Sequence, residues 1–286
     1  MSIFRAGRAR YPSVGALLFV LAGCSEQMPK IDARLDEAAQ KLLAPRKTPQ
    51  QYMILAVSSE DPDVRRDAVA RISASRQYAQ DWAIKGFIAI ACLDNDPQTR
   101  CVAIRALART GDPRAAETLL KILNYRDYPS HEVRPPDDLS RWDATVGLAD
   151  LLLGGRVPEE YRAAAHKTLR DRLHLDSDRH VRIAAARGLA ADASDETVRA
   201  LIDGLRDEDY AVAHQCEDSL VRLTGQTHNA DPTAWQAWYE ENRTELFAHA
   251  GEVPESRRPP YRNDFEKAVH NARELVRWLW PGAKEE

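Results

Sequence analysis

The sequence predicts an all-α protein: an α-α superhelix of about five stacked helical hairpins, with extra helices at its N- and C-terminal ends. The main observation is a motif, Arg-x-x-Ala-x-x-x-Leu, which occurs five times with small variations. The copies follow one another at 31 to 41 residues and begin at Arg65, Arg100, Arg141, Arg182 and Ala213. A period of this length is typical of stacked hairpins, because each hairpin buries its apolar face only against its neighbours.

Two further observations support the same fold class. An acidic cluster precedes every copy of the motif, starting at residues 61, 94, 137, 176 and 207. Carboxylates at the start of a helix cap free N–H groups and meet the positive end of the helix dipole. The chain also has only 13 glycines and 7% aromatic residues, which favours thin helical layers over a β-rich fold.

The motif copies and the turns between them define ten helices over residues 48–225. The expected pairs are 49–58 with 62–74, 78–93 with 97–109, 114–123 with 139–153, 158–173 with 179–190, and 195–206 with 210–223. In the second helix of the first pair, Val64, Ala68 and Ile72 lie four residues apart and therefore share one face. The middle residue is small because two helix backbones approach closely there. We expect the motif arginine to reach carboxylates of an adjacent turn or repeat.

Segments outside the repeats complete the expected organisation. Residues 24–47 are a tether and an N-terminal helix, and residues 226–250 form a helix that contains Trp235 and caps the open end of the core. This capping helix is expected to run to about Ala248. Residues 251–286 form a Pro-rich linker followed by an amphipathic C-terminal helix.

The first 23 residues have the features of an export signal. Three arginines precede a short apolar run, residues 14–22, which is far shorter than the roughly 20 residues that span a bilayer. The run ends in Leu21-Ala22-Gly23-Cys24, which resembles the lipobox of bacterial lipoprotein signal peptides. This resemblance implies that Cys24 is lipidated and becomes the mature N-terminus; the alternative is an ordinary export signal that happens to contain a cysteine. The expected location is the bacterial cell envelope.

The repeats themselves resemble HEAT repeats, particularly the short PBS-lyase-like variety. The shared residues are the acidic turn, the Val-Arg pair seen at Val181-Arg182, and the Ala and Leu that follow it. The third copy departs from this pattern with Ser140 in the valine position, and the fifth has Ala213 in place of arginine. The resemblance covers residues 48–225 and implies architecture more than activity.

Neither charge nor motifs indicate an enzyme or a nucleic-acid-binding protein. The net charge is −4, and it becomes −7 once residues 1–23 are removed, which is the wrong sign for a nucleic-acid binder. No catalytic motif occurs, and the single His131-Glu132 pair is too few for the iron site of the HEAT-like hydroxylases. We therefore expect no catalytic residue, no cofactor and no metal. The cysteines after Cys24 are odd in number, and Cys216 takes the small core position of the motif.

The largest departure from the repeat is an insertion within the third unit, residues 124–140. Aromatic side chains are common anchors of interfaces, and repeat insertions often lie on a binding face. The candidate partner-binding residues are therefore Tyr125, Tyr128, His131 and Trp142. The alternative is a tolerated surface insertion.

The sequence thus predicts a lipid-anchored scaffold that binds another envelope protein, with a bilayer contact through the acyl chain on Cys24 and no nucleic acid. An enzyme or cofactor-binding protein that uses the concave groove, as in lyase-like HEAT proteins, is the alternative. A purely structural role between membrane and cell wall is a third possibility.

Overall fold

The computed structural model describes residues 47–126, 131–257 and 263–279. The chain divides into two compact units, Met1–Thr48 and Pro49–Glu286, and every described helix belongs to the second unit. The sequence predictions that lie outside the described residues include the export signal, the lipid site at Cys24 and the helix expected before residue 44.

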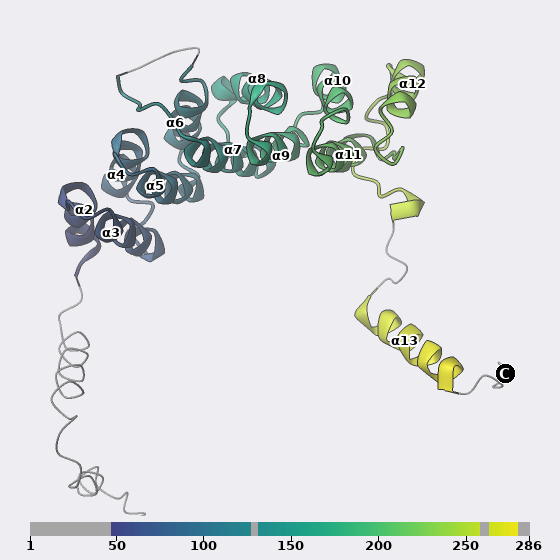
Figure 1. Cartoon of the computed structure of the whole chain (residues 1–286), viewed down its shortest axis with the longest axis horizontal. Helices are drawn as coiled ribbons and strands as arrows, with labels where there is room; N and C mark the ends of the chain where they lie inside the picture. Colours follow the sequence, from purple (N-terminus) through teal and green to yellow (C-terminus); the bar gives the residue numbers. More distant parts are fainter. Residues whose placement is uncertain (1–46, 127–130, 258–262, 280–286) are drawn as a thin grey trace, which may run out of the picture. The chain divides into compact units, whose positions relative to one another are not determined.

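Ten helices form five consecutive hairpins, and we call the first helix of each hairpin its A helix and the second its B helix (Figure 1). The hairpins are α2 (Pro49–Ser58) with α3 (Pro62–Ala74), α4 (Asp81–Leu93) with α5 (Pro97–Thr110), α6 (Pro113–Leu123) with α7 (Asp138–Leu153), α8 (Glu159–Leu175) with α9 (Arg179–Leu189), and α10 (Asp195–Gly204) with α11 (Tyr210–Thr224). They are followed by α12 (Pro232–Asn242), the short 3-10 helix η2 (Glu255–Arg257) and α13 (Asp264–Leu279). The predicted all-α repeat fold is confirmed.

The hairpins stack so that like helices lie side by side. Each B helix contacts the next B helix, from α3 to α11, and each A helix contacts the next A helix, from α2 to α12 (Figure 1). The core lies between these two layers, which we call the A layer and the B layer. Each hairpin therefore depends on its neighbours for burial, as expected of a solenoid.

The repeated motif supplies the core as predicted. The small position is fully buried in every copy, at Ala68, Ala103, Ala144, Ala185 and Cys216. The Leu position is also fully buried, from Ile72 to Leu220. Val64 is the exception, because its side chain is 38% exposed while Val181 in the same position is buried. Within the described residues no hairpin precedes α3, so no neighbour covers Val64.

Close helix contacts explain the small residues. A Cβ atom added to Gly204 of α10 would lie 2.6 Å from the Cys216 sulfur of α11. A Cβ atom added to Gly188 of α9 would lie 2.7 Å from the Ala149 Cβ of α7, and Gly147 meets Ala108 of α5 in the same way. Backbones of adjacent helices can approach this closely only because these side chains are small.

Helix α12 is shorter than predicted. It ends at Asn242, whereas the sequence pattern suggested that it runs to about residue 248. The chain turns after Asn242 and returns to the end of α11, where the Gly251 N–H donates to the Arg222 carbonyl at 3.0 Å. This turn places Leu246 in the core.

The three cysteines in the described part of the chain, Cys92, Cys101 and Cys216, are free and buried. Cys216 is thus a small core residue, as predicted. Among the described residues, no helix is both long and apolar enough to cross a membrane.

Candidate functional site

A ladder of ion pairs joins each hairpin to the next and accounts for the motif arginines. Arg65 donates two hydrogen bonds to Asp94 of the following turn, at 2.9 and 2.8 Å. The equivalent bonds run from Arg141 to Asp176 and from Arg182 to Asp207, and Arg100 pairs with Asp137. These pairs confirm that the arginine reaches an adjacent repeat. They hold the hairpins in register and are therefore structural.

In the turns that begin at Asp94, Asp176 and Asp207, the paired acids divide two tasks between them. Asp94 accepts the arginine of the preceding hairpin, while Asp96 caps α5 by accepting from the Thr99 N–H at 2.7 Å. In the third turn one residue, Asp137, performs both tasks, because it also accepts from the Ser140 N–H at 3.0 Å. The acidic clusters are therefore helix caps and ladder residues. Their roles are structural, so they are not candidate binding residues.

The candidate residues of the insertion occupy different surroundings. Tyr125 is partly buried and packs against the core just after α6, whereas His131 is exposed. Trp142 lies on α7 in the B layer and is 39% exposed. Tyr128 lies outside the described residues. Trp142 is thus the member of this set that faces solvent from a rigid helix.

Part of the insertion has a structural role. Val133 is buried, and the next residue, Arg134, donates from its main-chain N–H to the Cys92 carbonyl at 2.8 Å. The Arg134 side chain donates from Nε to the Leu93 carbonyl at 2.7 Å. These carbonyls lie at the end of α4, where a helix has no donors of its own. The segment 133–134 therefore closes the C-terminal end of a neighbouring helix.

The B layer presents an apolar and aromatic patch formed by Leu139, Trp142 and His180, which we call the α7–α9 patch. Leu139 is 47% exposed, and the Trp142 ring contacts the His180 ring of α9 with 5.1 Å between centroids. A second exposed aromatic pair, Tyr210 with His214, lies on α11. Large side chains exposed on rigid helices are typical anchors of protein interfaces.

A hollow of about 320 Å³ adjoins the patch on its α5 side. Its lining comes from α3, α5 and α7 and includes Leu139, Trp142, Val102, Arg66, Arg105 and Asp143. Asp143 is buried beneath it and pairs with Arg105 at 3.6 Å. Burial raises the pKa of the Asp143 carboxyl, although the Arg105 charge opposes this. The hollow combines an apolar rim with exposed arginine, a mixture that suits an amphipathic segment of a protein.

Alignment of the repeats on the motif arginine would have revealed this patch. Leu139 and His180 both stand two residues before the arginine, and Trp142 stands one residue after it. These positions face away from the buried Ala and Leu of the motif. The sequence prediction reached Trp142 through its closeness to the insertion and missed the other two residues.

Cys92 and Cys101 are not activated nucleophiles. Burial raises the pKa of the Cys101 thiol to about 12 and that of Cys92 to about 11, so both are protonated at neutral pH and poor nucleophiles. Within the described ranges, no group of three His, Cys, Asp or Glu side chains is arranged to hold a metal ion.

Comparisons with known proteins agree with the repeat architecture. Residues 49–134 match the family model of HEAT repeats. A designed armadillo repeat protein is similar to the chain with a TM-score of 0.44 and 15% identity, over 80% of this chain and 100% of that one. Armadillo repeat proteins computationally designed for modular peptide recognition are similar with a TM-score of 0.42 and 16% identity, over 80% and 99%. None of the curated proteins compared with the chain matches it.

Proposed function

We propose that this HEAT-like repeat protein is a scaffold that binds another protein of the bacterial cell envelope, and that a lipid on Cys24 anchors it to a membrane. The observation that carries the binding proposal is the α7–α9 patch. Its exposed Leu139, Trp142 and His180 lie together on two packed helices, beside a hollow of about 320 Å³.

Burial of this patch would supply part of the binding free energy. Covering an exposed leucine or tryptophan side chain contributes about 1.5 to 3 kcal/mol when the contact is complete. The patch lies on helices held by the buried core, so little conformational entropy is lost when a partner binds. Arg105, which is exposed at the hollow, adds a charged group that orients the partner.

The envelope location is supported by the N-terminal sequence. Three arginines, a nine-residue apolar run and Leu-Ala-Gly-Cys together have the order of a lipoprotein signal. In the proposed mature protein, the acyl chains on Cys24 enter the bilayer and the solenoid remains in the aqueous phase beside it. The partner is then a protein of the same compartment.

Site-specific cross-linking tests the binding surface. A photoreactive residue is placed on α7 at position 146, and cross-linked envelope proteins are identified from intact cells. The variants Leu139→Ala and Trp142→Ala should strongly reduce the yield of a cross-linked partner. Leu175→Ala, which removes an exposed leucine from α8, is the matched control and should leave the yield unchanged. Equal yields from all variants, with their helicity intact, would exclude the α7–α9 patch.

Fractionation tests the anchor separately. The Cys24→Ser variant should lose its acyl chains and leave the membrane fraction, whereas the unaltered chain should stay there. Metabolic labelling with a fatty-acid analogue should mark only the unaltered chain. Labelling of both forms, or the same distribution of both, would contradict lipidation at Cys24.

A further inference from the structure

We propose that the hollow between α2 and α4 binds an extended segment of a partner protein in which a branched apolar residue is followed by arginine. This inference rests on the proposed function, since it assumes a protein partner, but it concerns a different surface from the α7–α9 patch, lined by the ends of α2 and α4. The inference specifies the type of peptide sequence that this surface recognises.

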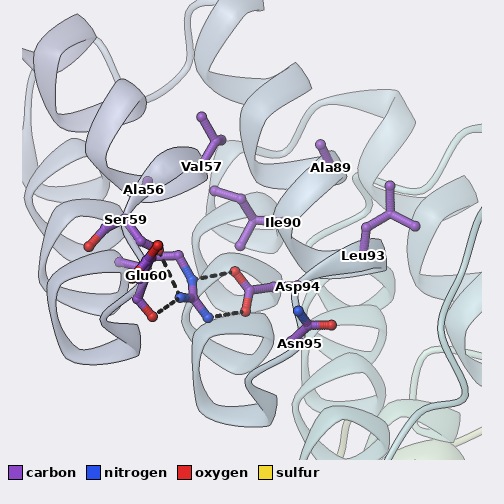
Figure 2. A pocket seen from close by; sticks show the side chains of 10 residues that line it. Ala56, Val57, Ser59, Glu60, Ala89, Ile90, Leu93, Asp94 and Asn95 are labelled. Carbon is purple, nitrogen blue, oxygen red and sulfur yellow. Dashed lines mark hydrogen bonds and ion pairs between the residues drawn. The ribbon is translucent and has the colours of Figure 1, made fainter.

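The hollow has a volume of about 510 Å³ and lies where the first two hairpins meet (Figure 2). Val57 and Ala89 line it from the two A helices, together with Leu93, and the ion pair of Arg65 with Asp94 closes one side. Val57 and Leu93 are exposed apolar side chains. The site thus offers an apolar wall next to a polar one.

The chain itself shows what occupies such a position one repeat further on. At the end of α4, Val133 is buried and Arg134 donates from its main chain to Cys92 and from its side chain to Leu93. These bonds satisfy carbonyls in the last turn of an A helix. The same segment then leads to Asp137, which forms the ladder pair with Arg100. A Val-Arg step therefore fits between the end of an A helix and the ladder.

The end of α2 has the same relation to the ladder but lacks such a segment of its own. Arg65 with Asp94 is the pair that precedes Arg100 with Asp137 by one repeat. The connection from α4 to α5 spans only residues 94–96, so it is too short to reach back over α2 as residues 131–136 reach back over α4. The segment that covers the end of α4 therefore has no counterpart over the end of α2 within the described residues.

The charges of the hollow suit an arginine. The Arg65 guanidinium is fully engaged, because Nε and Nη2 bind Asp94 and Nη1 binds the Ser59 and Glu60 carbonyls. The Glu60 carboxylate adds a negative charge at the exposed rim. With Arg65 neutralised by Asp94, the remaining charge is negative and complements a partner arginine.

A peptide with the sequence of residues 131–137, His-Glu-Val-Arg-Pro-Pro-Asp, is the probe, and its binding to the full chain is followed by fluorescence anisotropy. Replacing the peptide's valine by aspartate or its arginine by glutamate should weaken binding about tenfold or more. In the protein, Ala89→Trp fills the hollow and Leu93→Asp charges its wall, and both should have a similar effect. Leu175→Asp, at the same place in α8, is the matched control and should bind normally.

The position of the bound peptide decides the outcome. With a photoreactive residue in place of its valine, the peptide should cross-link to residues 56–60 of the protein. Cross-links to residues 121–124 would mean that it displaces the chain's own segment and would overturn the proposal, as would the absence of binding or equal binding by Leu93→Asp. If the chain dimerises and the Leu93→Asp substitution abolishes the dimer, the occupant of the hollow is a second copy of the chain. That result would also overturn the proposal. Loss of the α7–α9 cross-links is a separate result and concerns only the proposed function.

Discussion

Arg141 and Asp176 form a buried ion pair that joins the third hairpin to the fourth. Their side chains are 9% and 2% exposed, and two hydrogen bonds of 2.9 and 3.1 Å connect them. The second bond partner of Arg141, Asp138, is exposed, while Arg172 approaches Asp176 to 3.7 Å. The pair is the most deeply buried step of the ladder. Its removal should therefore lower the free energy of unfolding more than removal of an exposed pair.

Replacement of Arg141 by methionine should lower the free energy of unfolding by about 3 kcal/mol, because the Asp176 carboxylate stays buried with the Asp178 N–H as a donor and Arg172, 3.7 Å away, as its nearby cation. Arg187→Met is the control, since Arg187 and Asp150 pair at 2.7 Å with side chains that are 39% and 50% exposed. That substitution should cost about 1 kcal/mol or less. Urea denaturation followed by circular dichroism measures both values. Equal decreases in the free energy of unfolding would show that burial of the Arg141–Asp176 pair does not increase its contribution to stability.

Replacement of Gly188 by alanine should destabilise the protein although alanine is the better helix former. The added Cβ atom would lie 2.7 Å from the Ala149 Cβ and 3.0 Å from its Cα, so the α7 backbone would have to move. Overpacking of this kind costs about 1 to 3 kcal/mol, more than the roughly 1 kcal/mol gained in helix propensity.

The matched control for this prediction is Gly86→Ala in α4. The added Cβ atom there meets only the mobile end of the Met53 side chain, which can turn away. Its melting temperature should stay the same or rise, whereas that of Gly188→Ala should fall. A rise for both variants would show that the B helices can separate at little cost.

The hairpins could be predicted from the sequence because the residues that begin and end each helix are close together in the chain. Asp96 before Pro97 predicts a helix start whatever lies around it, and Asp96 does cap α5. The ladder also followed from a short-range pattern, since each arginine sits at a constant distance from its own turn. The end of α12 at Asn242 could not be predicted. It depends on the contact of the following segment with the end of α11, and no pattern in the nearby sequence indicates that contact.

The candidate site was predicted only in part for a similar reason. Trp142 contacts His180 across two packed B helices, and this contact depends on the register of the stack. Val133 and Arg134 fold onto the end of α4, about 40 residues earlier in the chain, as their bonds to Cys92 and Leu93 show. An insertion that looks like a free loop in the sequence is therefore partly a structural element.

Replacement of Glu217 by alanine should loosen the C-terminal end of the solenoid without affecting its start. Glu217 is buried and accepts hydrogen bonds from the Trp235 indole, from Thr227 at 2.6 Å and from Arg257 at 3.1 Å. The fifth motif copy has Ala213 instead of arginine, so these bonds take over where the ladder ends. Amide hydrogen exchange should quicken in α12 and η2 and stay unchanged in α3 and α5. Uniform acceleration would indicate that the solenoid unfolds as one unit.

Acid should weaken the protein through Asp192, which joins α8 to the turn before α10. Burial alone would raise the pKa of this carboxyl, but hydrogen bonds from His166, Thr197 and Ser194 lower it to about 2 from the ordinary 3.8. Because the folded-state pKa is the lower one, the stabilisation is complete above about pH 4 and is lost as the pH falls towards 2. It amounts to roughly 2 kcal/mol. The difference in stability between the unaltered chain and Asp192→Asn, measured by urea denaturation, should therefore shrink between pH 5 and pH 2. A difference that is constant over this range would show that the Asp192 carboxylate is not held in its charged form by these bonds.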